Sequence, residues 1–256
     1  MDATLYEVRG EAAWITLNQP ERRNALGDAI VAGLLAHLRR AIAYPAARVV
    51  VLTGAGPTFC AGADLRSGGG SAAATGAGDN PFVQVMKTIW DAPKPVIGRI
   101  NGHAFGGGVG LAAACDLTVA VDSAQFAFSE VRVGVIPAMI SVVCIPKLGV
   151  HQAMWLFLTG ERVPAARAVE LGLIHRAVPA AQLDAAVDEV IALVRLGGPN
   201  AVREAKQLVR RIPTLSMDEG FEYTAAKIAE LFASDEAAEG MRAFVAKRKP
   251  RWAEGS

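Results

Sequence analysis

The 256-residue sequence has few of the residues that mark disulfide-stapled or metal-binding proteins. Its three cysteines, Cys60, Cys115 and Cys144, are an odd number without CxxC spacing, which argues against a disulfide framework and for core thiols in a reducing compartment. The four histidines are dispersed, and no HxxxH or HExxH pair places two imidazoles on one helical face. We therefore expect no metal site.

The sequence also lacks an excess of charge of either sign. The 26 Lys and Arg residues nearly balance the 25 Asp and Glu residues, so no strong field attracts nucleic acid or an anionic membrane. Asp2, Glu7 and Arg9 near the start have no apolar stretch behind them, which argues against a signal peptide. The longest nearly uncharged run, 133–146, is too short to span a bilayer. We expect a cytoplasmic protein without nucleic-acid or membrane partners.

Hydrophobic runs and periodicities predict an α/β protein. Residues 5–17 are typical of two strands around Gly10 and Glu11, and apolar residues at helical spacing follow Asp28, a candidate N-cap. Continuous β-branched runs are typical of parallel strands buried on both faces. Such runs occupy residues 48–53, 95–100 and 117–121.

Two further stretches bear on the organisation of the chain. Residues 67–80 (SGGGSAAATGAGDN) have mostly small side chains, which cannot build a core, so this segment is predicted to form a mobile surface loop. Its neighbours Asp64 and Leu65 are then expected at the rim of a site. Beyond residue 180 the pattern becomes helical, and Ser216 with Glu219 is typical of a capping box. An α/β body followed by a helical C-terminal region is therefore expected.

Glycines stand at two places where a strand passes into a helix or loop, in residues 53–65 and 101–116. Glycine lets the backbone approach a ligand closely, and unpaired NH groups at a helix start favour an anion. Gly106 to Gly108 are therefore a candidate site for a developing oxyanion. Tight turns and close helix packing are the alternative explanation of these glycines. Dinucleotide binding is disfavoured because Leu111 takes the place of the third glycine of GxGxxG.

The order of motifs resembles the crotonase, or enoyl-CoA hydratase and isomerase, superfamily over nearly the whole chain. The segments that carry the resemblance are LNQPERRNAL (17–26), VLTG (51–54), FCAGADL (59–65), NG (101–102), GGG (106–108), CD (115–116), SEV (129–131), GVIP (134–137), LTG (158–160), GLI (172–174) and KRKPRW (247–252). The run GVIPAMIS (134–141) looks like that of bacterial methylglutaconyl-CoA hydratases. The resemblance implies a crotonase-type spiral of ββα units over 1–195, a helical trimerisation region over 196–256, and a homotrimer or dimer of trimers.

The resemblance also implies a site. The family's oxyanion hole matches the backbone NH groups of Ala63 and Gly107, and coenzyme A is part of the substrate, so no separate cofactor is expected. The residues that match the coenzyme A and acyl path are Arg22, Arg23, Ala25, Ala61, Asp64, Leu65, Arg66 and Gly110. Solvated surface charge is the alternative role of the two neighbouring arginines.

The acidic residues depart from the family pattern. Common hydratases use two glutamates to hold and activate a water, whereas this chain has Gly110 at the first position and Glu130 at the second. One carboxyl group still serves as a general acid or base if its pKa is tuned by a partly apolar site. An ordinary ion pair, for example with Arg132, is the alternative role of Glu130.

From this pattern we predict a lyase of fatty acid metabolism that adds water across the double bond of a short or branched enoyl-CoA. Glu130 would move the proton, and Gly110 would leave room for a bulkier acyl group. A Δ3,Δ2-enoyl-CoA isomerase that uses the same glutamate is the first alternative. An acyl-CoA hydrolase and a non-catalytic acyl-CoA binder are the others, because the family changes its reaction while keeping the oxyanion hole.

Overall fold

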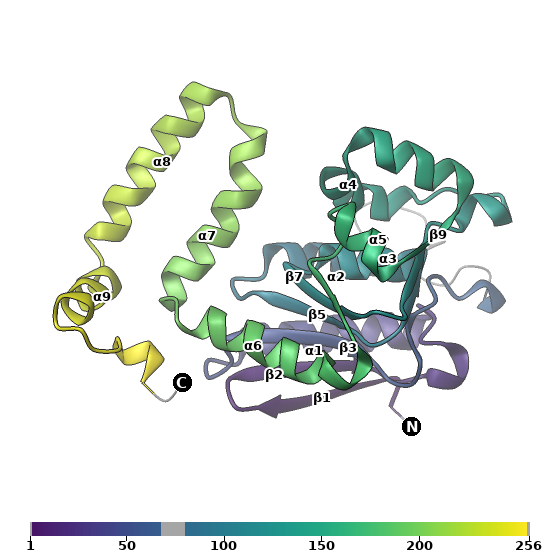
Figure 1. Ribbon diagram of the computed structural model, residues 1–256, viewed down its shortest axis with the longest axis horizontal. Coiled ribbons are helices and arrows are strands. Elements are labelled where there is room, and N and C mark those ends of the chain that lie inside the picture. Colours follow the sequence, from purple (N-terminus) through teal and green to yellow (C-terminus); the bar gives the residue numbers. More distant parts are fainter. Residues whose placement is uncertain (1, 68–79, 255–256) are drawn as a thin grey trace. The chain divides into compact units, whose positions relative to one another are not determined.

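A computed structural model of the protein describes residues 2–67 and 80–254, and it divides the chain into two compact units (Figure 1). The first unit consists of residues 1–92 and 96–187, and the second of residues 93–95 and 188–256. The predicted mobile loop lies, from residue 68 to residue 79, outside the described residues.

A six-stranded sheet in the order β1-β2-β3-β5-β7-β10 forms the base of the first unit. Its strands are β1 (Thr4–Arg9), β2 (Ala12–Leu17), β3 (Val49–Gly54), β5 (Val96–Ile100), β7 (Leu117–Val121) and β10 (Arg176–Val178). β1 pairs antiparallel with β2, and all further neighbours are parallel. The predicted hairpin and the three predicted parallel strands are thus confirmed, and β3 is buried along its whole length, as a strand covered on both faces should be.

A second sheet in the order β4-β6-β8-β9 was not apparent from the sequence. Its strands are β4 (Thr58–Cys60), β6 (His103–Phe105), β8 (Gln125–Ala127) and β9 (Arg162–Pro164). Each has three residues, which is too short for an alternating pattern to be recognised. β4, β6 and β8 pair parallel to one another and follow β3, β5 and β7 along the chain. Each pair of strands is followed by a helix, so the chain forms the expected succession of ββα units.

The helices of the first unit follow these strands. They are η1 (Pro20–Arg22), α1 (Asp28–Ala43), η2 (Leu65–Ser67), α2 (Pro81–Asp91), α3 (Gly107–Ala114), η4 (Glu130–Val133), α4 (Ala138–Thr159), α5 (Ala165–Glu170) and η5 (Ala180–Gln182). The predicted helix after Asp28 is confirmed as α1 and buries its apolar stripe. Gly27 is its N-cap, so the expectation of a cap at Asp28 is wrong by one residue. Asp28 instead places a negative charge in the first turn, where the helix dipole favours it.

Helix α4 is long and apolar enough to cross a membrane, judged by its length and composition alone. Its backbone is not a continuous helix, because Gly149 has φ 70° and ψ 160° and Pro146 stands three residues earlier. One side of α4 packs on α3 and buries residues that include Ile140, Cys144 and Leu148. These contacts are those of a helix that covers a protein core.

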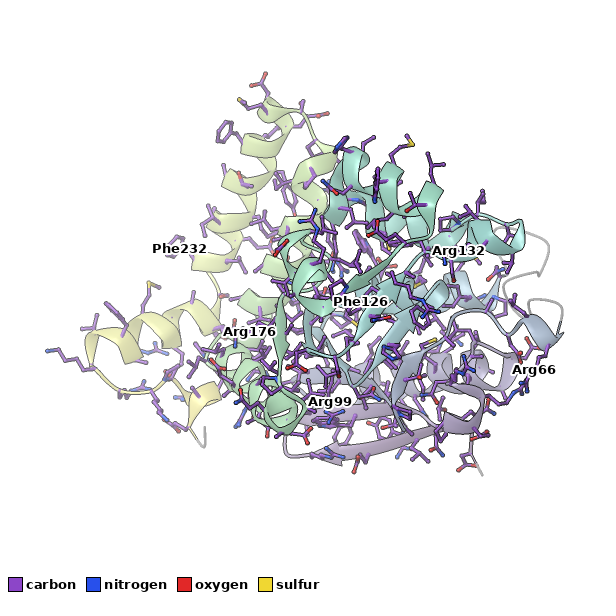
Figure 2. All side chains as sticks on the ribbon, turned by 45° about the vertical axis from the view of Figure 1, so that its right-hand side comes forward. Arg66, Arg99, Phe126, Arg132, Arg176 and Phe232 are labelled. Carbon is purple, nitrogen blue, oxygen red and sulfur yellow. The ribbon has the colours of Figure 1, made fainter. Side chains whose placement is uncertain are left out.

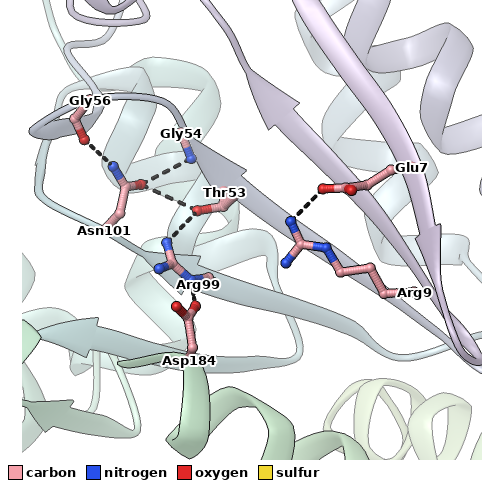
Figure 3. Close-up of polar contacts among 8 residues, drawn as sticks. All are labelled: Glu7, Arg9, Thr53, Gly54, Gly56, Arg99, Asn101 and Asp184. Carbon is pink, nitrogen blue, oxygen red and sulfur yellow. Dashed lines mark hydrogen bonds and ion pairs between the residues drawn. The ribbon is translucent and has the colours of Figure 1, made fainter. Parts of the chain in front are cut away.

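Polar side chains fix the turns that follow two strands of the large sheet. The amide of Asn101, after β5, donates to the carbonyl oxygen of Gly56 at 2.7 Å and accepts from the backbone NH of Gly54 at 2.9 Å (Figure 3). Asp116 accepts from the backbone NH of Val96 at 2.7 Å and joins the starts of β5 and β7. The bonds of Asn101 hold together the ends of β3 and β5, from which the site loops extend, and the bond of Asp116 holds together the starts of β5 and β7.

The second unit is helical, as the sequence predicts. Its elements are the second part of α6 (Leu183–Arg195), α7 (Pro199–Arg211), η6 (Ile212–Thr214), α8 (Met217–Phe232), α9 (Asp235–Val245) and η7 (Arg251–Ala253). Ser216 and Glu219 form the predicted capping box at the start of α8. The buried Glu239 accepts two hydrogen bonds from Arg248, at 2.8 and 3.0 Å, which lowers the pKa of the carboxyl to about 2. This ion pair ties α9 to the chain that follows it.

Candidate active site

The loop before α1 lies against the loop that follows β4. The backbone NH of Ala61 donates to the carbonyl oxygen of Arg23 at 3.0 Å, and that of Leu26 donates to Gly62 at 2.7 Å. The buried amide of Asn24 holds this arrangement by donating to the carbonyl oxygen of Thr58 at 2.8 Å. Six of the predicted residues therefore lie on two loops in direct contact. These are Arg22, Arg23, Ala25, Ala61, Ala63 and Asp64.

Asp64 acts as the anchor of this loop pair. The residue is 5% exposed, and its carboxylate forms an ion pair with Arg22 and accepts a hydrogen bond from the backbone NH of Arg66 at 3.2 Å. The negative charge of Asp64 is therefore neutralised by Arg22, and the carboxylate links Arg22 to the start of η2. Because a buried charge is tolerated when it is paired and hydrogen-bonded, these contacts explain why the carboxylate of Asp64 is buried.

The other two arginines are available to a ligand. The side chains of Arg23 and Arg66 are exposed, and neither makes an ion pair with another described residue. Figure 2 shows Arg66 at the edge of the first unit. Leu65, which directly precedes Arg66 in the chain, is 63% exposed and offers an apolar surface next to that charge. Two cations and a hydrocarbon surface fit a ligand with phosphate groups and an uncharged body.

The two glycine segments meet at the predicted oxyanion hole. A methyl group added at Gly62 would lie 3.2 Å from the amide nitrogen of Gly107, so the residue before Ala63 contacts the start of α3. As the first residue of α3, Gly107 has no carbonyl group four residues earlier in the helix to accept its proton. Among the described residues, the NH of Ala63 likewise has no acceptor. Two adjacent loops thus each supply one unpaired donor.

Glu130 lies beside the same helix start. It begins η4, and a methyl group added at Gly106 would lie 3.1 Å from Oε1 of its carboxyl. Burial raises the pKa of Glu130, an effect partly opposed by a hydrogen bond from its own backbone. Its buried Oε2 has no hydrogen-bond partner among the described residues. The alternative role in an ion pair with Arg132 is wrong for the described structure, because Arg132 instead donates to the carbonyl oxygen of Thr159.

Gly110 does not leave open room, and that expectation is wrong. A methyl group added there would lie 2.1 Å from Cγ2 of Ile140 and 2.7 Å from its Cβ. The side chain of Ile140, on α4, therefore occupies the space that any side chain at position 110 would need. Gly110 is fully buried in the packing of α3 on α4 and contacts this side chain.

Sequence reasoning missed three residues that shape the site, namely Asn24, Ile140 and Cys144. Asn24 is marked in the sequence only as part of the motif at 17–26, although its φ of 52° is typical of asparagine. Ile140 and Cys144 lie on α4, where the apolar run 133–146 gave no sign of which side chain faces α3. Burial raises the pKa of the Cys144 thiol to about 12, and the nearby charge of Glu130 acts in the same direction.

Comparisons with known proteins show the family to which the chain belongs. The family model described as enoyl-CoA hydratase/isomerase matches residues 7–255. A "Probable enoyl-CoA hydratase" of Rhizobium meliloti is 35% identical over 250 residues, which cover 97% of this chain and 96% of the relative. A carnitinyl-CoA dehydratase of Proteus mirabilis is 35% identical over 215 residues, which cover 81% and 82% of the two chains.

A solved structure extends the likeness to the fold. The crystal structure of an enoyl-CoA hydratase/isomerase from Marinobacter aquaeolei superposes with a TM-score of 0.89 at 34% identity, covering 99% of this chain and 100% of the other. The chain has the crotonase fold and belongs to the enoyl-CoA hydratase/isomerase family. It is an enzyme of that family, and an acyl-CoA substrate is consistent with this membership.

Proposed function

We propose that the protein is an enoyl-CoA hydratase that adds water to a short or branched enoyl thioester with Glu130 as its single proton-transferring group. The observation that carries this proposal is the position of Glu130. Its carboxyl has an elevated pKa, one partnerless oxygen, and contact with Gly106 at the start of α3. A protonated carboxyl beside unpaired backbone donors combines an acid with an anion-stabilising site.

The thioester oxygen binds between the NH groups of Ala63 and Gly107. Negative charge moves onto this oxygen when a nucleophile attacks the β carbon of the conjugated double bond. Donors held in place before the reaction stabilise that charge without reorganising, and each such donor contributes about 2.7–4 kcal/mol in enzymes where one has been removed. The contact between Gly62 and Gly107 holds the two donors in neighbouring positions.

One protonated carboxyl group is sufficient for the proton transfers. The water oxygen bonds to the β carbon and gives one proton to the unprotonated oxygen of Glu130, while the other oxygen gives its proton to the α carbon. The carbon–carbon π bond breaks, and the carboxyl group ends as neutral as it began. The raised pKa of Glu130 favours this starting form.

An isomerase is the second candidate, and the contact between Gly110 and Ile140 favours it. The hydrocarbon side chain of Ile140 packs on Gly110 and offers no polar group to orient a water at that position. In isomerisation, ionised Glu130 takes a proton from the α carbon of a 3-enoyl thioester and returns it to the γ carbon. The same two backbone donors stabilise the dienolate.

We also propose that the protein associates with further copies of itself through the second unit. Large apolar side chains on α8 and α9 are exposed, as in interfaces between subunits rather than on monomer surfaces. They are Met217, Phe221, Ile228, Phe232, Met241, Phe244 and Val245. A homotrimer or a dimer of trimers is the expected assembly.

Incubation of the purified protein with three thioesters tests the proposed activity. Crotonyl-CoA and 3-methylglutaconyl-CoA should lose their conjugated absorbance and give products heavier by one water. Appearance of that absorbance from a 3-enoyl-CoA without water uptake would favour the isomerase instead. Release of free thiol would indicate a hydrolase, and saturable binding without turnover of any thioester would contradict both proposed reactions.

A further inference from the structure

The interface between α3 and α4 has two successive contact levels, and the first of them adjoins Glu130. Gly106 and Gly110 lie one helical turn apart at the start of α3, and Ile140 and Cys144 lie one turn apart on α4. Gly106 contacts the carboxyl of Glu130, whose charge also acts on Cys144. Gly110 and Ile140 contact each other directly and form the next level along both helices.

The groups that face Glu130 from these helices are uncharged. α3, with the sequence GGVGLAAA, carries no polar side chain, and Ile140 is 3% exposed. Cys144 remains a neutral thiol because burial raises its pKa to about 12. The nearest cation on α4 is Lys147, which donates to the carbonyl oxygen of Cys115 at 3.1 Å. The side chains that α3, Ile140 and Cys144 place at this interface are therefore hydrocarbon and thiol.

We propose that Ile140 limits this site to one carboxyl group and thereby determines which reaction it performs, because its side chain occupies, against Gly110, the volume that any side chain at position 110 would need. The inference rests on the proposed function, since it names the residue that limits the site to one carboxyl group. Ile140 does not move a proton itself. It excludes a side chain at position 110, so that Glu130 is the single carboxyl group of the site, and is therefore a specificity-determining residue.

The contact between Gly110 and Ile140 makes the two positions interdependent. Even Gly110→Ala adds a carbon 2.1 Å from Cγ2 of Ile140, well inside contact distance, so this variant must shift α3 or α4. Ile140→Gly removes the obstructing atoms. The double variants Gly110→Ala/Ile140→Gly and Gly110→Glu/Ile140→Gly should therefore both be more thermostable than Gly110→Ala and Gly110→Glu alone.

Comparison of these two double variants isolates the effect of the second carboxyl group. Each is incubated with crotonyl-CoA and with a 3-enoyl-CoA, and the ratio of hydration to isomerisation is measured. We expect Gly110→Glu/Ile140→Gly to raise this ratio at least about tenfold over the alanine control, because a second carboxyl group positions a water. Val143→Gly, a truncation at another buried position of α4, controls for loosening of the helix.

Titration of the Glu130 side chain by carbon-13 NMR provides a measurement that needs no turnover. The signal is assigned by its loss in Glu130→Gln. In Gly110→Glu/Ile140→Gly the signal of Glu130 should titrate in two coupled steps, as expected for neighbouring carboxyl groups, whereas the alanine control should show one step.

The outcomes separate the inference from the proposed function. A wild-type protein inactive on every thioester would remove the proposed function, while the NMR titration would still decide the role of Ile140. Two results would overturn the inference: a Gly110→Glu variant as stable as the wild type, or a folded double variant whose product ratio and titration match those of the alanine control.

Discussion

Asn24 and Thr58 are joined by a 2.8 Å hydrogen bond from the buried side-chain amide of Asn24 to the carbonyl oxygen of Thr58. The same amide nitrogen donates to Ala55 at 2.9 Å, and its oxygen accepts from the backbone NH of Gln19 at 2.9 Å. One side chain thus holds the loop that carries Arg22 and Arg23 on the turn that leads into β4.

Replacing Asn24 should destabilise the protein. Asn24→Ala leaves one buried and two part-buried backbone groups without this partner and places alanine at a φ of 52°, so we expect a loss of about 2–4 kcal/mol in the free energy of unfolding. Chemical denaturation measures this loss. Asn18→Ala, which removes one exposed hydrogen bond to Asp2, is the control and should cost less than about 0.5 kcal/mol. Equal costs for the two variants would contradict the role of Asn24.

Glu130→Gln should lower kcat about 10²- to 10⁴-fold, the range that a general acid or base contributes. The amide keeps the shape of the carboxyl group, so binding of the thioester should change little. Steady-state kinetics and calorimetric titration with a substrate analogue measure the two effects. Glu170→Gln, at an exposed glutamate paired with Arg167, should retain full activity. Unchanged turnover in Glu130→Gln would remove Glu130 from the mechanism.

The pH dependence of the rate should distinguish hydration from isomerisation. Burial raises the pKa of Glu130, so its protonated form persists to higher pH than that of an exposed glutamate. Hydration through the protonated carboxyl should have a constant kcat/KM below this pKa and lose about tenfold per pH unit above it. Isomerisation through the carboxylate should show the opposite trend, rising with pH and levelling off above the same pKa. A profile that is flat from pH 4 to pH 9 for both substrates would contradict both mechanisms.

Arg23 and Arg66 should contribute to binding of coenzyme A through its phosphates. Arg23→Ala and Arg66→Ala should each raise KM for a CoA thioester about tenfold or more, the cost of one charge-assisted hydrogen bond, and leave kcat unchanged. The matching N-acetylcysteamine thioester lacks the phosphates, so its KM should not change. Arg167→Ala, at an exposed arginine on α5, is the control. An equal rise in KM for both thioesters would argue against phosphate contact.

Exposed aromatic residues of the second unit should hold the proposed oligomer together. Phe244→Asp, at a side chain that is 84% exposed, should dissociate the assembly without unfolding the chain, because a charge in an apolar interface is costly to desolvate. Light scattering after gel filtration gives the mass. Val8→Asp, on the edge strand of the first unit, is the control. A wild-type monomer, or a Phe244→Asp variant of unchanged mass, would contradict the proposed interface.

Much of the fold could be predicted because its signals are local. The β-branched runs that form β3, β5 and β7 and the Ser216–Glu219 capping box are each complete within a few residues. The second sheet was missed because its three-residue strands are specified by pairing partners more than 20 residues away in the sequence. Contacts of that kind leave no periodic pattern.

The candidate site likewise has one part that could be predicted from the sequence and one part that could not. Its residues could be proposed from motif order, and the contact of Gly62 with Gly107 agrees with the motif. The relation between Gly110 and Ile140 was not predictable, because a glycine shows that a side chain is absent and not what fills the space. The residue that fills this space, Ile140, lies on α4, 30 positions further along the chain.

The proposed oxyanion hole uses no side chain, and this has an evolutionary consequence. Mutation can exchange the methyl group of Ala63 without removing the donor, whereas a methyl group at Gly62 or Gly108 would collide with backbone oxygen atoms at 2.7 and 2.2 Å. Selection on thioester binding therefore constrains the glycines and leaves the surrounding side chains comparatively free. Under the proposals made above, substitutions at positions such as Ile140 would change the reaction in related proteins while the binding of the thioester by backbone groups is retained.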